Sequence, residues 1–354
     1  MAKKKNKSTK KIRTFFITLG LVVLVGGGFK IFQLYRQVEE TNINLDGKKE
    51  VYIYIPTGSD YKDVTNILYA NNYIINRASF EWVAEKKGYA GLVKPGKYKL
   101  KDGMSNNQLI NLLRSGKQVP VKLVFNKIRT KDRFAGIISN QIEADSLELL
   151  KLLNNESFLS DYGLNRETAL CLFIPNTYEL YWNTDAKAFV KRMDKEFENF
   201  WNKTRLEKAN SMGLSREEVI TMASIVEEET VKNDEKPRVA GVYYNRIKKG
   251  MRLQADPTVR FAVGDFEIKR ILTKHLSIDS PYNTYRKAGL PPGPICIPTI
   301  SSIDAVLNYE KHSYLYFCAK DDFSGYHAFA KTLQQHNVNA EKYRKALNKN
   351  RIYR

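Results

Sequence analysis

The order of apolar and polar residues separates an apolar N-terminal segment from a long mixed region. Residues 14–29 form a stretch of 16 residues without a charge, and the apolar pattern resumes over residues 31–35 after Lys30. A membrane-spanning helix needs about 20 apolar residues, and a lysine near its end can extend its amine to the interface. The pattern therefore predicts a transmembrane helix over residues 15–36.

The segment before this helix predicts its orientation. Residues 1–14 contain seven basic residues and no acidic one. Such an excess of cations is typical of the cytoplasmic side of a span, so residues 1–14 are predicted to be a cytoplasmic leader and the rest to lie outside the membrane. The alternative is a cleaved signal peptide, with the glycines at 26–28 near the cleavage site. Both alternatives export the remaining chain.

A short polar segment and a compact unit follow. Residues 37–49 are polar and are predicted to be a linker. Residues 50–118 then show a strand at 51–55, a helix after Asp60, a second helix from about Asn76, and a strand that reaches Leu100. This order of strand, helix, helix and strand resembles the LysM glycan-binding module. A spacer domain without a ligand remains the alternative.

Residues 119–354 show a mixture of both periodicities. The pattern predicts a strand at 119–128, a buried strand at 314–319 and loops after residue 250, where prolines are frequent. It also predicts helices over the ranges 131–153, 186–210, 216–231 and 237–249. The predicted fold class is α+β: an N-terminal transmembrane helix, a LysM-like subdomain and a mixed α+β catalytic domain over 119–354.

The helix predicted at 216–231 carries the densest polar chemistry. Ser215 and Glu218 have the spacing of a capping box at its start. At 100° per residue, Val219, Met222, Ala223 and Val226 form one apolar stripe. Glu228 falls opposite the stripe, where solvent is expected, whereas Glu227 and Glu229 fall on its two flanks.

A carboxyl group at the edge of an apolar face has a physical reason to act as an acid. Partial burial and a neighbouring carboxylate both disfavour the charged form, so such a glutamate can keep a proton near neutral pH. The pattern alone does not distinguish Glu227 from Glu229. The alternative is a charged helix end in which a glutamate pairs with Lys232.

Net charge and cysteine content narrow the classes of function. The charge of +20 includes seven positive charges in the leader and a further five over residues 341–354, a C-terminal tail. An exported domain without a zinc finger or a helix-turn-helix signature is not expected to bind nucleic acid. The three cysteines and four histidines have no metal-ligand spacing, so no metal and no cofactor are predicted. The spacing leaves open whether two of Cys171, Cys296 and Cys318 form a disulfide.

The residues 223–230, ASIVEEET, begin a series of motifs that extends for over a hundred residues. This series resembles the signature of the endolytic murein transglycosylases, the MltG (YceG-like) family. An upstream block, 174–179, departs from the family pattern at Asn176, which stands in place of an aspartate. The matching segments are, in order, 239–246, 250–259, 282–285, 289–295, 314–317, 327–329 and 336–337.

The resemblance implies a function and a catalytic residue. The family cleaves peptidoglycan glycan strands between N-acetylmuramic acid and N-acetylglucosamine and leaves 1,6-anhydro ends. Its catalytic glutamate is taken as the first after Ser-Ile-Val, which is Glu227 here. Glu229 is a substrate-binding candidate that either raises the pKa of Glu227 or holds a loop. The polar and aromatic residues of the other motifs are candidates for a sugar cleft: Asn245, Gln254, Asp256, Thr258, Tyr282, Asn283, Thr284 and Tyr285.

The resemblance also implies an inner-membrane location and a role beside membrane peptidoglycan synthases. Two other functions remain open. One is a hydrolytic muramidase, in which water enters the same cleft. The other is a non-catalytic scaffold that binds peptidoglycan.

Overall fold

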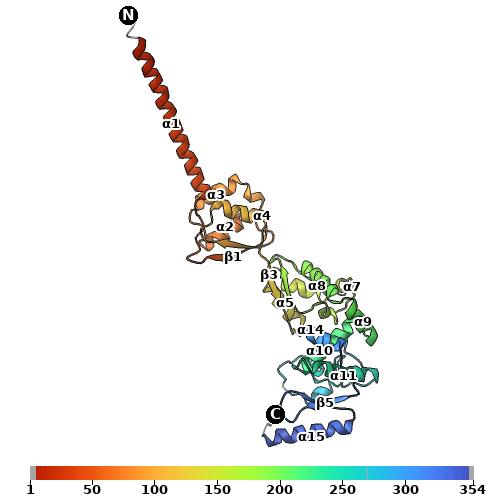
Figure 1. Ribbon diagram of the computed structural model, residues 1–354. Helices are drawn as coiled ribbons and strands as arrows, with labels where there is room; N and C mark the ends of the chain where they lie inside the picture. Colours follow the sequence, from red (N-terminus) through yellow and green to blue (C-terminus); the bar gives the residue numbers. More distant parts are fainter. Residues whose placement is uncertain (1–4, 269, 351–354) are drawn as a thin grey trace. The chain divides into compact units, whose positions relative to one another are not determined.

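The computed structural model describes residues 5–268 and 270–350. The chain divides into two compact units (Figure 1). Unit 1 comprises Met1–Val121 together with Leu180–Asn183, and unit 2 comprises Lys122–Glu179 together with Thr184–Arg354. The structure contains both helices and strands, so the predicted mixed class is confirmed. The domain ranges expected from the sequence stay predictions.

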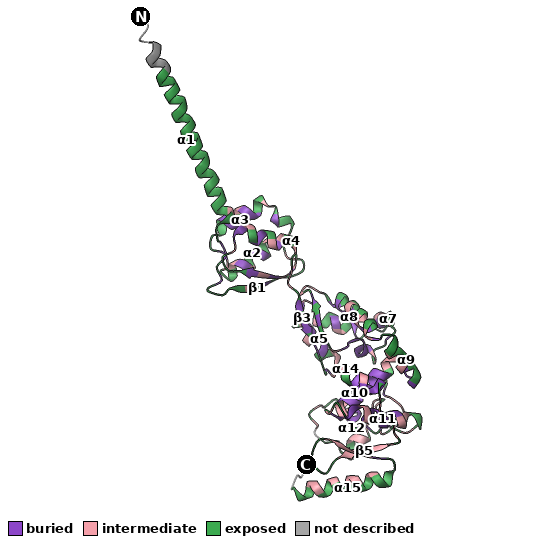
Figure 2. Ribbon diagram, viewed as in Figure 1, coloured by how far each residue is buried: buried purple, intermediate pink, exposed green. Residues whose placement is uncertain are grey.

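Unit 1 begins with the long helix α1, Lys5–Glu39. Within the described residues, Lys10–Glu39 is the one helical segment long and apolar enough to cross a membrane. Its apolar side chains, such as Val22 and Leu24, are exposed along the helix (Figure 2). An apolar helical segment whose side chains are exposed in the protein needs another apolar surrounding, which a bilayer supplies. This fits the predicted span, but the direction of insertion stays a prediction.

The rest of unit 1 follows the predicted order of strand, helix, helix and strand. The strands β1 and β2 pair antiparallel, with Ile53 opposite Tyr98. In Figure 1 the helices lie together on one side of β1. The LysM identity of this unit stays a prediction. Its elements are β1 Glu50–Ile55, α2 Tyr61–Ala70, α3 Arg77–Lys86, the 3₁₀ turn η1 Tyr89–Gly91, β2 Gly96–Lys101 and α4 Asn106–Ser115.

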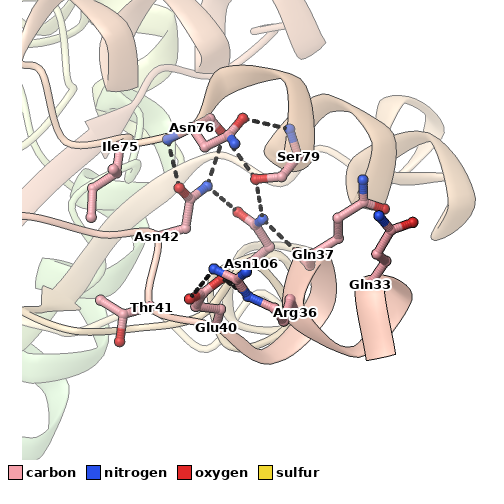
Figure 3. Close-up of a pocket in the computed structure, with 10 residues that line it drawn as sticks. All are labelled: Gln33, Arg36, Gln37, Glu40, Thr41, Asn42, Ile75, Asn76, Ser79 and Asn106. Atoms are coloured by element: carbon pink, nitrogen blue, oxygen red, sulfur yellow. Dashed lines mark hydrogen bonds and ion pairs between the residues drawn. The ribbon is translucent and has the colours of Figure 1, made fainter. Parts of the chain in front are cut away.

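Part of the expected linker belongs to the core of unit 1. Ile43 and Leu45 are only 1% and 2% exposed, because they pack with the apolar side chains of the helices. Beside them, Asn42 donates to Asn106 Oδ1 at 2.6 Å and accepts from the Asn76 backbone at 2.6 Å. Asn106 in turn donates to the Gln37 carbonyl at 2.9 Å (Figure 3). This buried polar cluster attaches the end of α1 to the unit, which a free linker would not do.

Unit 2 is mainly helical, with two small sheets, β3–β4 and β5–β6. Its strands are β3 Val121–Val124, β4 Thr177–Leu180, β5 Tyr316–Ala319 and β6 His327–Ala330. Its first helices are α5 Lys131–Ser139, α6 Ser146–Leu152, α7 Glu156–Ser160, η2 Ala169–Leu172, α8 Ala186–Phe200 and α9 Lys203–Met212. They are followed by α10 Arg216–Glu229, α11 Lys236–Lys248, α12 Asp256–Val263, α13 Thr273–Leu276, α14 Ile300–Leu307 and α15 Leu333–Lys349.

Five regions differ from the sequence expectation. The helix expected at 131–153 is two helices, because the chain turns after Ser139 and restarts at the cap Asp145. The helix expected at 186–210 is also two helices, α8 and α9, because the chain turns after Phe200 and restarts at the cap Asn202. The strand expected to be buried at 314–319 is β5, which is only half-buried. The region after residue 250 contains α12 and α14 as well as loops. Pro257 lies in the first turn of α12, where proline starts a helix instead of ending one. The basic C-terminal region is largely α15, which contacts β5 and β6.

Candidate active site

Helix α10 lies at the centre of unit 2. The predicted capping box is confirmed: Ser215 Oγ accepts from the Glu218 backbone, and the Glu218 carboxylate accepts from the Ser215 backbone. Every residue from Val219 to Glu227 is buried (Figure 2), including those outside the predicted apolar stripe. The helix is therefore enclosed by neighbours, among them α11, α12 and α14, and has no broad solvent face.

This enclosure makes the prediction for Glu228 wrong. Its side chain is only 6% exposed, although the helical wheel places it opposite the stripe. Arg129 Nη2 lies 2.7 Å from Glu228 Oε2, and Lys127 Nζ lies 3.7 Å from Oε1. The segment before α5 covers this side of the helix and supplies two cations to the carboxylate, so Glu228 has a structural ion pair in place of solvent.

Glu227 lies on the flank of α10 that faces α14. Its Oε2 atom accepts hydrogen bonds from Thr299 Oγ1 at 2.6 Å and from Ser302 Oγ at 2.5 Å. Lys236 Nζ, at the start of α11, lies 3.1 Å from the same oxygen. Both charged side chains are buried, at 4% exposure for Lys236 and 9% for Glu227. This is a closed cluster of a carboxylate with its own counter-charge.

The contacts of Glu227 favour its charged form. Burial pushes its pKa upward, but hydrogen bonds from Ser302 and Thr299, together with the positive charge of Lys236, outweigh burial and hold the pKa below its ordinary value. A carboxyl group with a lowered pKa is ionised at neutral pH and has no proton to donate. In this state Glu227 serves to hold α10, α11 and α14 together.

Glu229 lies on the opposite flank and faces a cavity of about 460 Å³. The hydroxyl of Tyr243, from α11, donates to Glu229 Oε1 at 2.5 Å. Arg246, one helical turn after Tyr243, also lines the cavity. The strand β5 contributes another part of the wall, including Tyr316. Glu229 is therefore a glutamate of α10 that reaches a space large enough for a ligand.

The surroundings of Glu229 favour its protonated form. Burial raises its pKa to about 7, against the lowering effect of the Tyr243 hydrogen bond, and the negative charge of Asp256 adds to the rise. A carboxyl group with a pKa near 7 is present in both forms at neutral pH, as a general acid that must then act as a base requires.

Three other predicted site residues line the same cavity: Gln254, Asp256 and Tyr285. The Tyr285 hydroxyl donates to Asp256 Oδ1 at 2.6 Å, which fixes both side chains at the start of α12. Gln254 has a left-handed backbone conformation, with φ of 51°. For a residue other than glycine this conformation is strained, and such strain concentrates at functional sites.

The remaining predicted residues lie in the supporting structure. Thr258 and Thr284 are buried, and their hydroxyls lie 2.8 Å apart, where they tie α12 to the loop after α13. Asn283 is buried and donates to the carbonyls of the preceding loop. Asn245 donates to the backbone of the segment before β5. Tyr282 packs on Phe261, 4.7 Å between ring centroids, and lines a different cavity.

Several side chains in and beside the cavity were not predicted from the sequence. His327 lines it, and its Nδ1 lies 2.7 Å from Glu235 Oε2. Glu235 is 3% exposed and also accepts from the His327 backbone at 2.8 Å, so it fixes the position of the imidazole. Arg246 donates to the carbonyls of Leu253 and Leu315, which joins the loop before Gln254 to the strand region. His327 and Arg246 lie in motif segments of the sequence, 327–329 and 239–246, whereas Glu235 lies outside them.

The chemistry available in the cavity comes from these side chains. Among residues 5–268 and 270–350, no cluster of histidine, cysteine or acidic residues could hold a metal ion. The three cysteines are free thiols, and burial raises the pKa of Cys171 and Cys318 above the ordinary value. The cavity thus combines a protonatable carboxyl group with amide, hydroxyl, imidazole and aromatic groups, a set suited to a sugar chain.

The pattern of the YceG-like family matches residues 53–342, which is most of the chain and includes the whole cavity. The chain belongs to this family. The resemblance inferred from the motifs is thereby confirmed.

Known relatives agree with this assignment. A Bacillus subtilis protein named endolytic murein transglycosylase is 32% identical over 338 residues, which cover 91% of each chain. A Streptococcus pneumoniae protein of the same name is 28% identical over 90% of this chain but only 63% of its own length. The crystal structure of a YceG-like protein from Listeria monocytogenes, 32% identical, covers 82% of this chain with a TM-score of 0.56.

Proposed function

We propose that this protein is an endolytic murein transglycosylase. It cleaves the bond between N-acetylmuramic acid and N-acetylglucosamine within peptidoglycan strands and leaves 1,6-anhydro ends. Family membership and the name of the relatives support the reaction class. The observation that carries the assignment to a site is the cavity that contains Glu229, a carboxyl group with a pKa of about 7.

Glu229 is the better general acid of the two candidate glutamates. It reaches the cavity and can hold a proton near neutral pH. Glu227, the residue expected from the motif, is enclosed by Thr299, Ser302 and Lys236, and its pKa is lowered. The role of Glu227 as general acid therefore stays a prediction that competes with this proposal, and variants of the two residues distinguish between them.

The reaction needs one group that first gives a proton and then takes one. Protonated Glu229 donates its proton to the glycosidic oxygen as the bond from that oxygen to C1 breaks. The C6 hydroxyl of the muramic acid then attacks C1, and its proton passes to the Glu229 carboxylate. The acid is regenerated and no water is consumed, so a second carboxylate is not required, unlike in most glycosidases. The substrate's acetamido group can stabilise the positive charge at C1.

The cavity lining fits the substrate. Gln254 and Asp256 offer an amide and a carboxylate to sugar hydroxyls and acetamido groups. Tyr285 and Tyr316 provide ring faces for the C–H surfaces of sugars, and His327 offers an imidazole nitrogen.

One digestion experiment tests the reaction against its alternatives. Purified glycan strands are incubated with the full-length protein in detergent, and the products are analysed by mass spectrometry. Anhydro ends, lighter than reducing ends by one water, support the transglycosylase. Reducing ends would identify a hydrolytic muramidase, and intact strands would identify a non-catalytic scaffold. Either of these results would overturn the proposal.

The anchoring of the protein belongs to the same proposal. Helix α1 spans the membrane with the basic leader on the cytoplasmic side, and the chain after α1 lies outside. One helix of sufficient length and apolar character supports a single-pass anchor. Labelling of single cysteines introduced on either side of the span, by a reagent that does not cross membranes, tests the orientation. Action beside membrane peptidoglycan synthases stays a prediction.

A further inference from the structure

Arg246, on α11, carries a buried positive charge in the cavity that contains Glu229. The residue is 7% exposed and lines this cavity. Its guanidinium donates to the backbone carbonyls of Leu315, at 2.6 Å, and Leu253, at 2.7 Å, which are uncharged acceptors. Within the part of the chain that the structure describes, Arg246 forms no ion pair, and its Nη2 atom has no hydrogen-bond partner. One nitrogen of a buried cation is thus left for a ligand.

The cations beside the other two glutamates of α10 differ from Arg246, because each has a carboxylate partner. Lys236 lies 3.1 Å from Glu227, and Arg129 lies 2.7 Å from Glu228. A buried charge without a counter-charge is costly, since it loses its hydration and gains no ion pair in return. Burial lowers the pKa of Arg246, but a guanidinium keeps its proton at neutral pH. An acidic group of a ligand would compensate this charge.

Arg246 also supplies the positive charge of the cavity wall. The described residues that line the cavity include no lysine and no second arginine. His336 lines it too, but burial, together with the charge of Arg246, lowers its pKa, so the imidazole is neutral at neutral pH. The guanidinium carbon of Arg246 lies 5.1 Å from the centroid of the Tyr316 ring, a cation–π contact that helps to hold it in place.

Helix α11 places this charge beside the proposed acid. Tyr243, whose hydroxyl donates to Glu229, precedes Arg246 by three residues on the helix. Residues at this spacing are neighbours on one helix face, with about 5–6 Å between their Cβ atoms. A substrate group bound by Arg246 is therefore expected on the sugar whose C1 bond Glu229 protonates.

The two sugars of peptidoglycan differ in the group that such a cation recognises. N-acetylmuramic acid carries a lactyl group on its C3 oxygen, where N-acetylglucosamine has a hydroxyl. The lactyl group ends in a carboxylate or, where a stem peptide is attached, in an amide carbonyl. Both accept hydrogen bonds from a guanidinium, and the carboxylate also compensates its charge. Since one carbon separates C3 from C1, the lactyl group lies close to the bond that is cleaved.

We propose that Arg246 binds the lactyl group of the N-acetylmuramic acid whose C1 is attacked, and so selects this sugar over N-acetylglucosamine at the reacting position. The choice of sugar rests on the proposed function. Arg246 determines specificity, whereas proton transfer stays with Glu229. A strand is then bound in the register that presents the muramic acid to Glu229, and a chain of N-acetylglucosamine alone lacks the group that fixes this register.

The test compares two disaccharides that differ only in the lactyl group. One is N-acetylglucosaminyl-N-acetylmuramic acid and the other is di-N-acetylchitobiose. Neither has a bond from C1 of muramic acid to another sugar, so binding to the full-length protein in detergent is measured without cleavage, by ligand-observed NMR at neutral pH. We expect the wild type to bind the muramic disaccharide about tenfold more tightly. Arg246→Gln should remove this preference and leave the affinity for chitobiose unchanged.

Controls separate recognition from folding, which circular dichroism monitors. Arg252→Gln removes an exposed arginine of the loop after α11 and should keep the tenfold preference. A purely structural Arg246 would weaken both disaccharides equally when it is replaced. Arg246→Lys keeps the charge but loses the planar fork, so the preference should fall to about threefold, and this variant decides the question if Arg246→Gln does not fold.

Three results would overturn the proposal. They are equal binding of the two disaccharides by the wild type, an unchanged preference in folded Arg246→Gln, and an unchanged preference in Arg246→Lys. Equal binding by the wild type would mean that Glu229 and Asp256 compensate Arg246 over a longer distance. Anhydro products together with equal binding would leave the proposed function intact. Lactyl-dependent binding without any strand cleavage would overturn the proposed function and leave the lactyl site intact.

Discussion

The two flanks of helix α10 carry the same functional group in opposite environments. Glu227 accepts hydrogen bonds from two hydroxyl groups and lies beside Lys236, and its pKa is lowered. Glu229, two residues later, accepts a hydrogen bond from the Tyr243 hydroxyl, and burial raises its pKa to about 7. The helix contributes equally to both, so the neighbouring elements decide which glutamate holds a proton.

One helix can thus supply both a structural and a catalytic carboxyl group. A buried carboxylate with a counter-charge and several donors joins elements together. A buried carboxyl group whose pKa is raised to about 7 by burial is present in both its protonated and its charged form at neutral pH. Variants of the two flanks should therefore have opposite effects on activity and stability.

The largest expected effect is on catalysis. Glu229→Gln removes the proton donor and should lower the rate of strand cleavage by about 10²- to 10⁴-fold. Glu227→Gln should leave the rate per folded molecule near the wild-type value. The measurement is the initial rate of formation of anhydro ends, corrected for the folded fraction by circular dichroism. If Glu227→Gln is inactive while Glu229→Gln cleaves normally, the assignment of the two flanks is reversed.

The second effect is on stability, and here the change at Glu227 is expected to matter more than the change at Glu229. Glu227→Gln leaves the ammonium group of Lys236 buried without its counter-charge, which should reduce the stability of unit 2 by about 3–5 kcal/mol. The measurement is the melting temperature of the full-length protein in detergent. The double variant Glu227→Gln/Lys236→Met removes both charges and should recover part of the loss. Equal melting temperatures for wild type and Glu227→Gln would argue against a structural ion pair.

The third effect concerns pH. The folded-state pKa of Glu229, about 7, lies above the ordinary value of 4.5, so its protonated form adds stability at low pH that is lost as pH rises through about 7. Activity should fall over the same range, because the general acid loses its proton. Tyr243→Phe removes the donor that lowers this pKa and should move the falling limb to higher pH.

The matched variant for this shift is Asp256→Asn. It removes a negative charge that raises the pKa of Glu229, so the falling limb should move to lower pH. The measurement is the pH dependence of the cleavage rate for the three proteins. Identical profiles would mean that Glu229 does not control the rate.

The smallest expected effect concerns Glu228, which lies between Glu227 and Glu229 in the sequence. Arg129→Gln leaves Glu228 with Lys127 as its nearby cation, at 3.7 Å. Because that partner remains, the expected loss is only about 1–2 kcal/mol, with the cleavage rate unchanged. Thermal unfolding and the cleavage assay measure both quantities. A loss as large as that of Glu227→Gln would show that the position on the helix, more than the counter-charge, sets stability.

Much of the local structure could be predicted from patterns among neighbouring residues. The apolar run over α1, the capping box at Ser215 and the alternation in β1 are patterns within a few neighbouring residues. The sequence did not reveal α12 or α14, because prolines near their starts were taken as loop signals. It also did not reveal that Ile43 and Leu45 join the core of unit 1, since two apolar residues in a polar segment carry no periodicity.

The sequence by itself determined the family, the mixed fold class and the three glutamates on one helix, because these depend on residue identity and spacing. The angles on the helical wheel placed Glu227 and Glu229 on separate flanks but left both open as the acid. Only the tertiary structure brought Lys236, Thr299 and Ser302 to one flank and Tyr243 and a cavity to the other. The pKa of a carboxyl group depends on burial and on charges from distant parts of the chain, which no local pattern contains.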